Sequence, residues 1–193
     1  MNLPNKLTIL RILLIPVFAA VYLIGAIPYN FLIAGCIFTI AALTDFLDGY
    51  IARKHNLVTN LGKFLDPIAD KILVSTAFIL MLVSPFGSSE VILPQYAAIA
   101  VAIILARELM VSGFRIVAAS KGLVLAADKS GKIKTFTQDI AIVVLLVAPT
   151  FNSFPSAANV IHFVGLGILG VATILTIVSG IEYLVKNKAV LKD

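Results

Sequence analysis

Six apolar stretches, each about long enough to cross a lipid bilayer, make up most of this sequence. A transmembrane α-helix needs roughly 17–25 mostly apolar residues, and the polar segments between these stretches are short. Hydrophobic residues account for 60% of the chain and charged residues for 13%, a composition that excludes an ordinary soluble domain. The sequence therefore predicts an all-α integral membrane protein, a six-transmembrane-helix bundle in a single domain that covers residues 1–193.

Proline, glycine and polar residues mark the ends of the predicted helices. Pro85, Gly87 and Pro94 mark one of the turns, and Pro16 falls inside the first stretch, where a kink is expected. The single cysteine, Cys36, lies in an apolar run and is predicted to be buried without a disulfide partner. The predicted helices cover residues 7–24, 31–53, 61–83, 96–119, 132–148 and 158–185.

The distribution of positive charge predicts the orientation in the membrane. Fifteen lysines and arginines outnumber ten acidic residues, and a net charge of +5 could by itself suggest nucleic acid. These basic residues instead recur between alternate apolar stretches, and the segments around 84–95 and 149–159 contain none. Cytoplasmic loops carry an excess of Lys and Arg, and such charges also meet anionic headgroups of membrane lipids. The pattern argues against nucleic acid and predicts a multi-pass protein of the cytoplasmic membrane, with both termini and the hairpin formed by the second and third stretches on the cytoplasmic side.

Four aspartates interrupt the second and third stretches. Asp45 and Asp48 lie three residues apart near the end of one predicted helix, and Asp66 and Asp70 lie four apart near the start of the next. Such spacings place side chains on one helix face. In an antiparallel pair, Asp45 and Asp66 would lie on the order of 12 and 8 Å from their helix ends, which is a similar depth. An ionised Asp at the bilayer centre costs about 2.5–3.5 kcal/mol, so four together favour a site for hard divalent cations, Mg²⁺ or Mn²⁺.

Small residues accompany these acids. Gly49 follows Asp48 directly, Ala52 comes three residues later, and Gly62 precedes Asp66 by one helical turn. A residue without a side chain lets a ligand or a second helix approach the backbone closely. The small residues therefore predict a shallow floor, with metal-binding carboxylates at its rim.

Two runs resemble the signature of the CDP-alcohol phosphatidyltransferase family: DFLDGYIAR, from Asp45 to Arg53, and GKFLDPIAD, from Gly62 to Asp70. The resemblance implies that CDP-diacylglycerol reacts with an alcohol to give a phosphodiester lipid and CMP. It implies that two divalent ions are held by the four aspartates, with Asp70 also acting as general base. The cytidine nucleotide is then expected to contact Asn5, Thr8, Asp48, Gly49, Ala52, Arg53 and Gly62.

Further motifs are similar to the phosphatidylglycerophosphate synthase branch of that family, which uses glycerol 3-phosphate as acceptor. The phosphate dianion of this acceptor calls for Arg or Lys donors, whereas serine and inositol carry no phosphate. The candidate donors are Arg107, Arg115, Lys132 and Lys134, although ordinary positive-inside anchoring would also explain them. Glu108 is expected to pair with Arg107 or Arg115. The motifs are PNKLTILR at 4–11, RE at 107–108, SGFR at 112–115 and GKIKT at 131–135.

Alternatives from other classes remain open. A different acceptor within the same family, such as serine, inositol or phosphatidylglycerol, would fit the signature equally well. A divalent-cation transporter would also place acids within helices, but it would need a polar path to the opposite face. A membrane scaffold gives no reason for clustered acids. The family resemblance further implies a homodimer.

Overall fold

The computed structural model describes residues 2–54, 59–121, 123 and 129–188. Within these ranges it leaves ten side chains undescribed, those of Phe46, Asp48, Tyr50, Ala52, Arg53, Asn60, Leu61, Lys63, Phe64 and Lys129. The described chain forms long α-helices and one short 3₁₀ helix. The α-helices are α1 (Leu3–Leu23), α2 (Asn30–Lys54), α3 (Asn60–Met81), α4 (Ala97–Ser120), α5 (Lys129–Val147) and α6 (Pro155–Lys186), and the 3₁₀ helix η1 (Ala148–Phe151) joins the last two.

The six predicted helices are confirmed, and α1, α5 and α6 each begin three or four residues earlier than predicted. The first helix begins at Leu3 and the last at Pro155, each a few residues earlier than predicted. Both have a proline in the first turn. Proline fits there because its missing N–H has no partner inside the helix at that position. A proline close to an apolar stretch thus began these helices.

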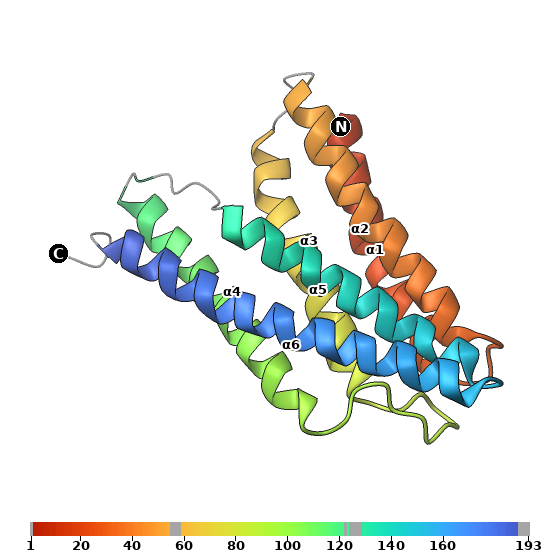
Figure 1. The fold of residues 1–193 in the computed structure, drawn as a ribbon. Coiled ribbons are helices and arrows are strands. Elements are labelled where there is room, and N and C mark those ends of the chain that lie inside the picture. The colour runs from red at the N-terminus through yellow and green to blue at the C-terminus, as the bar shows by residue number, and fades with distance from the viewer. Residues whose placement is uncertain (1, 55–58, 122, 124–128, 189–193) are drawn as a thin grey trace.

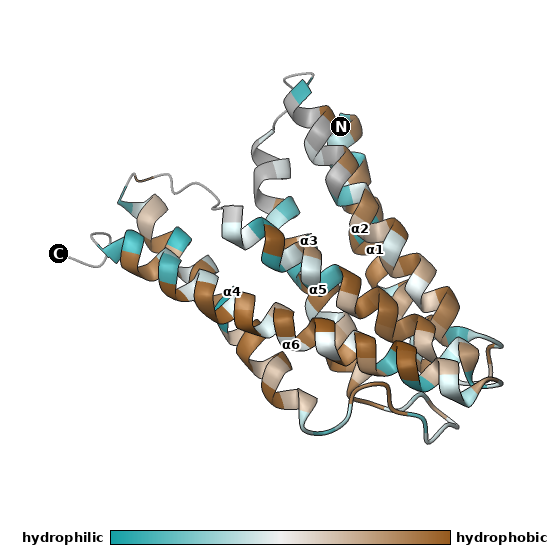
Figure 2. Ribbon diagram, in the orientation of Figure 1, coloured by the Kyte–Doolittle hydropathy of each residue, from teal (hydrophilic) through white to brown (hydrophobic). Residues whose placement is uncertain are grey.

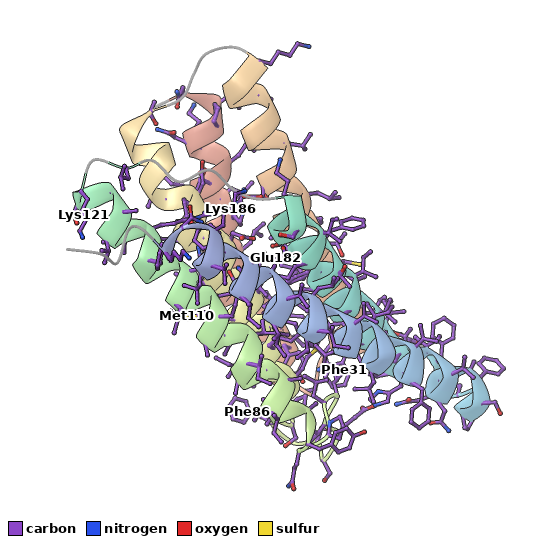
Figure 3. The ribbon with its side chains drawn as sticks, turned by 60° about the vertical axis from the view of Figure 1, so that its left-hand side comes forward. Phe31, Phe86, Met110, Lys121, Glu182 and Lys186 are labelled. Atoms are coloured by element: carbon purple, nitrogen blue, oxygen red, sulfur yellow. The ribbon has the colours of Figure 1, made fainter. Side chains whose placement is uncertain are left out.

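The helices run back and forth between two ends of the molecule (Figure 1). Helix α1 packs against α2 and α3, α6 packs against α4 and α5, and α2 contacts α5 across the middle. The start of α1 and the end of α6 belong to one end, and the turn from α5 to α6 belongs to the other (Figure 1). Figure 3 shows Lys121 and Lys186, at the ends of α4 and α6, away from Phe86 in the loop that precedes α4.

Aromatic and aliphatic side chains fill the core between the helices. Phe18, Tyr22, Phe38 and Phe78 are completely buried and belong to one cluster, which also includes residues of α4, α5 and α6. The rings of Phe18 and Phe38 lie 6.1 Å apart, so α1 and α2 are fixed directly to each other. This cluster forms the core of the half of the bundle in which the turn between α1 and α2 lies.

The outer surface is also strongly apolar. Leu13, Leu109 and Ile116 are 61%, 72% and 71% exposed, and many other large hydrophobic side chains join them. Figure 2 shows hydrophobic residues along most of the helix lengths and hydrophilic ones mainly toward the ends. Cys36, predicted to be buried, is exposed on α2, and this prediction was wrong because an apolar residue on a membrane helix can face outward. An apolar surface of this extent suits a membrane-embedded protein.

Four helical segments are long and apolar enough to cross a membrane: Leu3–Leu23, Ala97–Ser120, Ser130–Phe151 and Pro155–Lys186. The apolar part of α2 is shorter and ends at Asp45. Helix α3 carries Lys63, Asp66, Asp70 and Lys71 within its first twelve residues. The residues that interrupt the apolar character of α2 and α3 are thus largely the ones the sequence singled out, and the count of six spans stays a prediction.

Candidate active site

A cavity of about 890 Å³ is lined by acids of α2 and α3 and by basic residues of α4 and α5. Asp45 and Gly49 come from α2, and Asp66 and Asp70 from α3. Glu108, Asp139, Ser179 and Tyr183 also line it, so α6 contributes as well. Eight of the residues predicted from the sequence share this cavity: Asp45, Gly49, Asp66, Asp70, Arg107, Arg115, Lys132 and Lys134.

Asp45 is held from behind by Arg11. The Arg11 side chain is completely buried, while that of Asp45 is 45% exposed toward the cavity. Arg11 Nη1 donates to Asp45 Oδ1 at 2.6 Å, and Nε donates to the Ala41 carbonyl oxygen at 3.2 Å. The guanidinium therefore ties one carboxylate oxygen and one backbone carbonyl of α2 to α1. Sequence reasoning left Arg11 out of the site, although an arginine inside an apolar stretch is itself a signal of function.

Asp66 is held by α1 in a similar way. Thr8 Oγ1 lies 2.6 Å from Asp66 Oδ1 and donates to it, and the same hydroxyl is 3.2 Å from the Pro4 carbonyl oxygen. Thr8 is almost fully buried and does not line the cavity. Thr8 therefore lies behind Asp45, Asp66 and Asp70, which we call the acidic wall of the cavity, and it orients the carboxylate of Asp66.

Asn5 joins the start of α3 to α1. Thr59 caps α3 by accepting from the Gly62 amide at 3.0 Å, and its hydroxyl donates to Asn5 Oδ1 at 2.9 Å. A Cβ atom on Gly62 would lie 3.0 Å from Asn5 Oδ1 and 3.8 Å from Asp66 Oδ2. The absence of a side chain at Gly62 thus permits the close approach of α1 and α3 beside the acids, as its spacing suggested.

The cations that line the cavity, Arg107, Arg115, Lys132 and Lys134, form what we call the basic wall. Two of them belong to an ion-pair network with Glu108. Glu108 Oε1 pairs with Arg107 Nη1 at 3.3 Å and, more closely, with Lys134 Nζ of α5. The Lys134 side chain is 2% exposed and that of Arg107 is 12% exposed. The expected pairing of Glu108 with Arg107 is confirmed, and Lys134 is a further partner that the sequence did not predict. Burial with a carboxylate partner distinguishes these two cations from surface anchors.

Arg115 and Lys132 complete the basic wall with more exposed side chains. Arg115 Nε donates to the Tyr183 hydroxyl at 3.2 Å, and its guanidinium carbon lies 5.5 Å from the centre of that ring. Asp139 of α5 lines the cavity too. Sequence reasoning missed Tyr183, because a tyrosine near a helix end carries no signal that it faces an arginine.

Three of the predicted residues lie outside the described side chains: Asp48, Ala52 and Arg53. Their backbone continues α2 beyond Asp45, and Gly49, in the same turn, lines the cavity. Their predicted parts in metal and nucleotide binding stay predictions.

A sequence profile of the CDP-alcohol phosphatidyltransferase family matches residues 1–180. The chain belongs to this family. A Bacillus subtilis protein named CDP-diacylglycerol–glycerol-3-phosphate 3-phosphatidyltransferase is 42% identical to this transferase over 99% of the chain and 97% of its own length. Proteins of the same name from Rickettsia bellii and Shigella flexneri are 41% and 35% identical, over 94% and 100% of the chain and 93% and 98% of their own lengths.

CDP-alcohol phosphatidyltransferases generally depend on divalent cations. Among the side chains that the structure describes, no three acids, histidines or cysteines lie close enough together to form a metal site. Asp45, Asp66 and Asp70 nevertheless line one cavity, and Asp48, whose side chain is not described, lies one helical turn beyond Asp45. Carboxylate oxygens are the donors that hard divalent cations prefer, so the donor set fits a divalent metal ion.

Proposed function

We propose that this protein transfers the phosphatidyl group of CDP-diacylglycerol to sn-glycerol 3-phosphate, giving phosphatidylglycerophosphate and CMP. One observation carries the proposal, namely a single cavity that is lined both by acids of α2 and α3 and by cations of α4 and α5, of which Lys134 is buried. The relatives that cover nearly the whole chain bear the name of this reaction. We therefore assign the donor, CDP-diacylglycerol, to the acidic wall and the acceptor, glycerol 3-phosphate, to the basic wall of the same cavity.

The basic wall suits a phosphorylated acceptor. Arginine guanidinium groups bind phosphate oxygens through paired hydrogen bonds, and lysine adds a compact charge. Arg107, Arg115, Lys132 and Lys134 all line the cavity, and we assign the glycerol 3-phosphate dianion to them. Serine and inositol carry no phosphate to pair with these four cations, and Glu108 supplies a single carboxylate for two of them, Arg107 and Lys134.

The acidic wall suits the CDP group. Asp45, Asp48, Asp66 and Asp70 would hold two divalent ions, Mg²⁺ or Mn²⁺, whose charge neutralises a diphosphate and a departing phosphate. Asp48, Gly49, Ala52, Arg53 and Gly62 would bind the cytidine nucleotide. Asn5 and Thr8 would keep that site in place through Thr59 and Asp66.

Phosphoryl transfer needs a base for the acceptor hydroxyl, and we assign that part to Asp70. The hydroxyl oxygen attacks the lipid-side phosphorus, its proton passes to Asp70, and the bond from that phosphorus to the bridging oxygen breaks. The bridging oxygen keeps the electron pair and leaves with CMP. A single displacement of this kind leaves no phosphatidyl group on the protein, so recovery of a covalent phosphatidyl-enzyme after rapid quenching would contradict it.

We place the protein in the cytoplasmic membrane as a homodimer, with six spans and with its termini and cavity on the cytoplasmic side. The concentration of Lys and Arg at one end of the bundle supports this orientation. The short apolar part of α2 is compatible with crossing if the acids of α2 and α3 reach the aqueous face through the cavity.

An acceptor screen tests the function. Purified protein is incubated with CDP-diacylglycerol and Mg²⁺ or Mn²⁺, and CMP release is measured with glycerol 3-phosphate, serine, inositol or phosphatidylglycerol. We expect CMP release with glycerol 3-phosphate alone, and its loss in the Asp70→Asn variant. Release with serine or inositol instead would keep the family chemistry and overturn the assigned acceptor.

A further inference from the structure

Helix α6 contacts both arginines of the basic wall, although none of its residues entered the predicted site. Arg107 and Arg115 lie eight residues apart on α4, which is about two helical turns. Ser179, Gly180 and Tyr183 face them from the last turns of α6, and α4 and α6 lie side by side in Figures 1 and 3. Each arginine therefore has its own partner on the neighbouring helix.

At the first position, α6 contacts both the aliphatic part and the guanidinium group of Arg107. Ser179 Oγ accepts from Arg107 Nη2 at 3.1 Å. A Cβ atom on Gly180 would lie 3.0 Å from Arg107 Cγ and 3.6 Å from Nε. Gly180 thus leaves room for an arginine side chain that packs along the α6 backbone, and a methyl group there must displace it.

At the second position, Tyr183 holds Arg115. Its hydroxyl accepts from Arg115 Nε at 3.2 Å, and its ring lies below the guanidinium at 5.5 Å. Tyr183 is 2% exposed, and its ring packs edge-on against that of Phe114, with the ring centres 5.9 Å apart. Val111 and Ala118 bury the same ring, in a cluster separate from the main core. A hydrogen bond and a cation–π contact from a rigid ring hold a side chain that is otherwise exposed.

We propose that Ser179, Gly180 and Tyr183 are positioning residues that hold Arg107 and Arg115 in the geometry required to bind the acceptor's phosphate. An arginine loses rotamer entropy when it is fixed, and a preformed contact removes that loss from the binding step. The preference for a phosphorylated acceptor would then depend on α6 as well as on the cations. This inference rests on the proposed function.

The Gly180→Ala variant, with Gly170→Ala as matched control, tests the packing contact. Both glycines lie on α6, and a Cβ on Gly170 would meet nothing within 4 Å. We expect Gly180→Ala to raise the KM for glycerol 3-phosphate roughly tenfold, since displacing a positioned group by about 1 Å can cost up to about 100-fold. The KM for CDP-diacylglycerol and the kcat should stay at the wild-type values, and Gly170→Ala should match the wild type throughout.

Tyr183→Phe and Ser179→Ala remove one hydrogen-bond acceptor each and test the polar contacts independently. Both should raise the KM for glycerol 3-phosphate several-fold. Ser179→Thr keeps a hydroxyl acceptor and should have the wild-type KM. The thermal unfolding midpoint of each purified variant identifies misfolding, and Tyr183→Phe carries the test if Gly180→Ala is unstable. Unchanged KM values in all three variants, or equal rises for both substrates, would overturn the positioning role. Failure of the proposed function would instead appear in the wild type, as CMP release that does not respond to glycerol 3-phosphate.

Discussion

At the scale of single residues, buried Arg11 supports the acidic wall. Its side chain has no exposure, while its partner Asp45 is 45% exposed and lines the cavity. A buried charge is strongly destabilising when its partner is removed. The same contact directs one oxygen of Asp45 away from the cavity. Arg11 thus stabilises α1 against α2 and limits the orientations that this carboxylate can take.

We therefore expect Asp45→Asn to lower stability more than Asp70→Asn. A hydrogen bond to a charged group contributes about 1.5–3 kcal/mol, and the partial exposure of Asp45 favours the lower end. Both variants should lose CMP release, so activity does not separate them. The two variants are separated by the thermal unfolding midpoint of purified protein in a metal chelator, because without metal this midpoint reports only the protein's own contacts. Equal midpoints for the two variants would contradict the structural role of the Arg11 pair.

Lys134 gives a second prediction at this scale, because it is a buried cation on the acceptor side. Replacing it by alanine should raise the KM for glycerol 3-phosphate roughly 10- to 100-fold, the range of about 1.5–3 kcal/mol for a charged hydrogen bond. The KM for CDP-diacylglycerol should change little. Lys188→Ala, at an exposed position after α6, is the control and should behave as the wild type. Equal rises in the KM values of both substrates would contradict a role in acceptor binding and would indicate that Lys134 stabilises the fold.

At the scale of elements, the close contact of α1 with the start of α3 places Asp66 beside Thr8. Gly62→Ala would press a methyl group against Asn5 Oδ1 and disturb the Thr59 cap, which contributes about 1 kcal/mol. We expect a higher KM for CDP-diacylglycerol and an unchanged KM for glycerol 3-phosphate.

Gly167→Ala is the matched control for this contact, because a Cβ there would meet nothing within 4 Å. Gly167 lies on α6 and is not among the residues that line the cavity. Kinetics with each substrate varied in turn should leave Gly167→Ala close to wild type. An effect of Gly62→Ala on the acceptor KM alone would contradict the division of the cavity into two walls.

At the scale of the whole molecule, the charge asymmetry predicts which end faces the cytoplasm. Cys36 is the single cysteine, so a Cys36→Ala background accepts a reporter thiol. In intact cells, an impermeant maleimide should label Ser89→Cys, in the loop before α4. It should label Lys188→Cys, after α6, only once the membrane is permeabilised. The reverse pattern would place the cavity on the outer side and contradict the proposed orientation.

The local features of this protein followed from the sequence by itself. Apolar stretches of sufficient length predicted six helices, and all six are present. The spacings of Asp45 with Asp48 and of Asp66 with Asp70 placed acids at the facing ends of α2 and α3, and the basic motifs supplied the candidate phosphate donors on α4 and α5. These features depend on residues within one or two helical turns, or on a short hairpin, so the chain order determines them.

Contacts between distant helices were decided by the tertiary structure. Arg11 meets Asp45 across 34 residues, Thr8 meets Asp66 across 58, and Arg115 meets Tyr183 across 68. Whether such residues meet depends on the rotation and tilt of each helix, which the packing of the whole bundle sets. Periodicity within one helix gives the residues that share a face, but the neighbour that this face meets is fixed only when all the helices pack together.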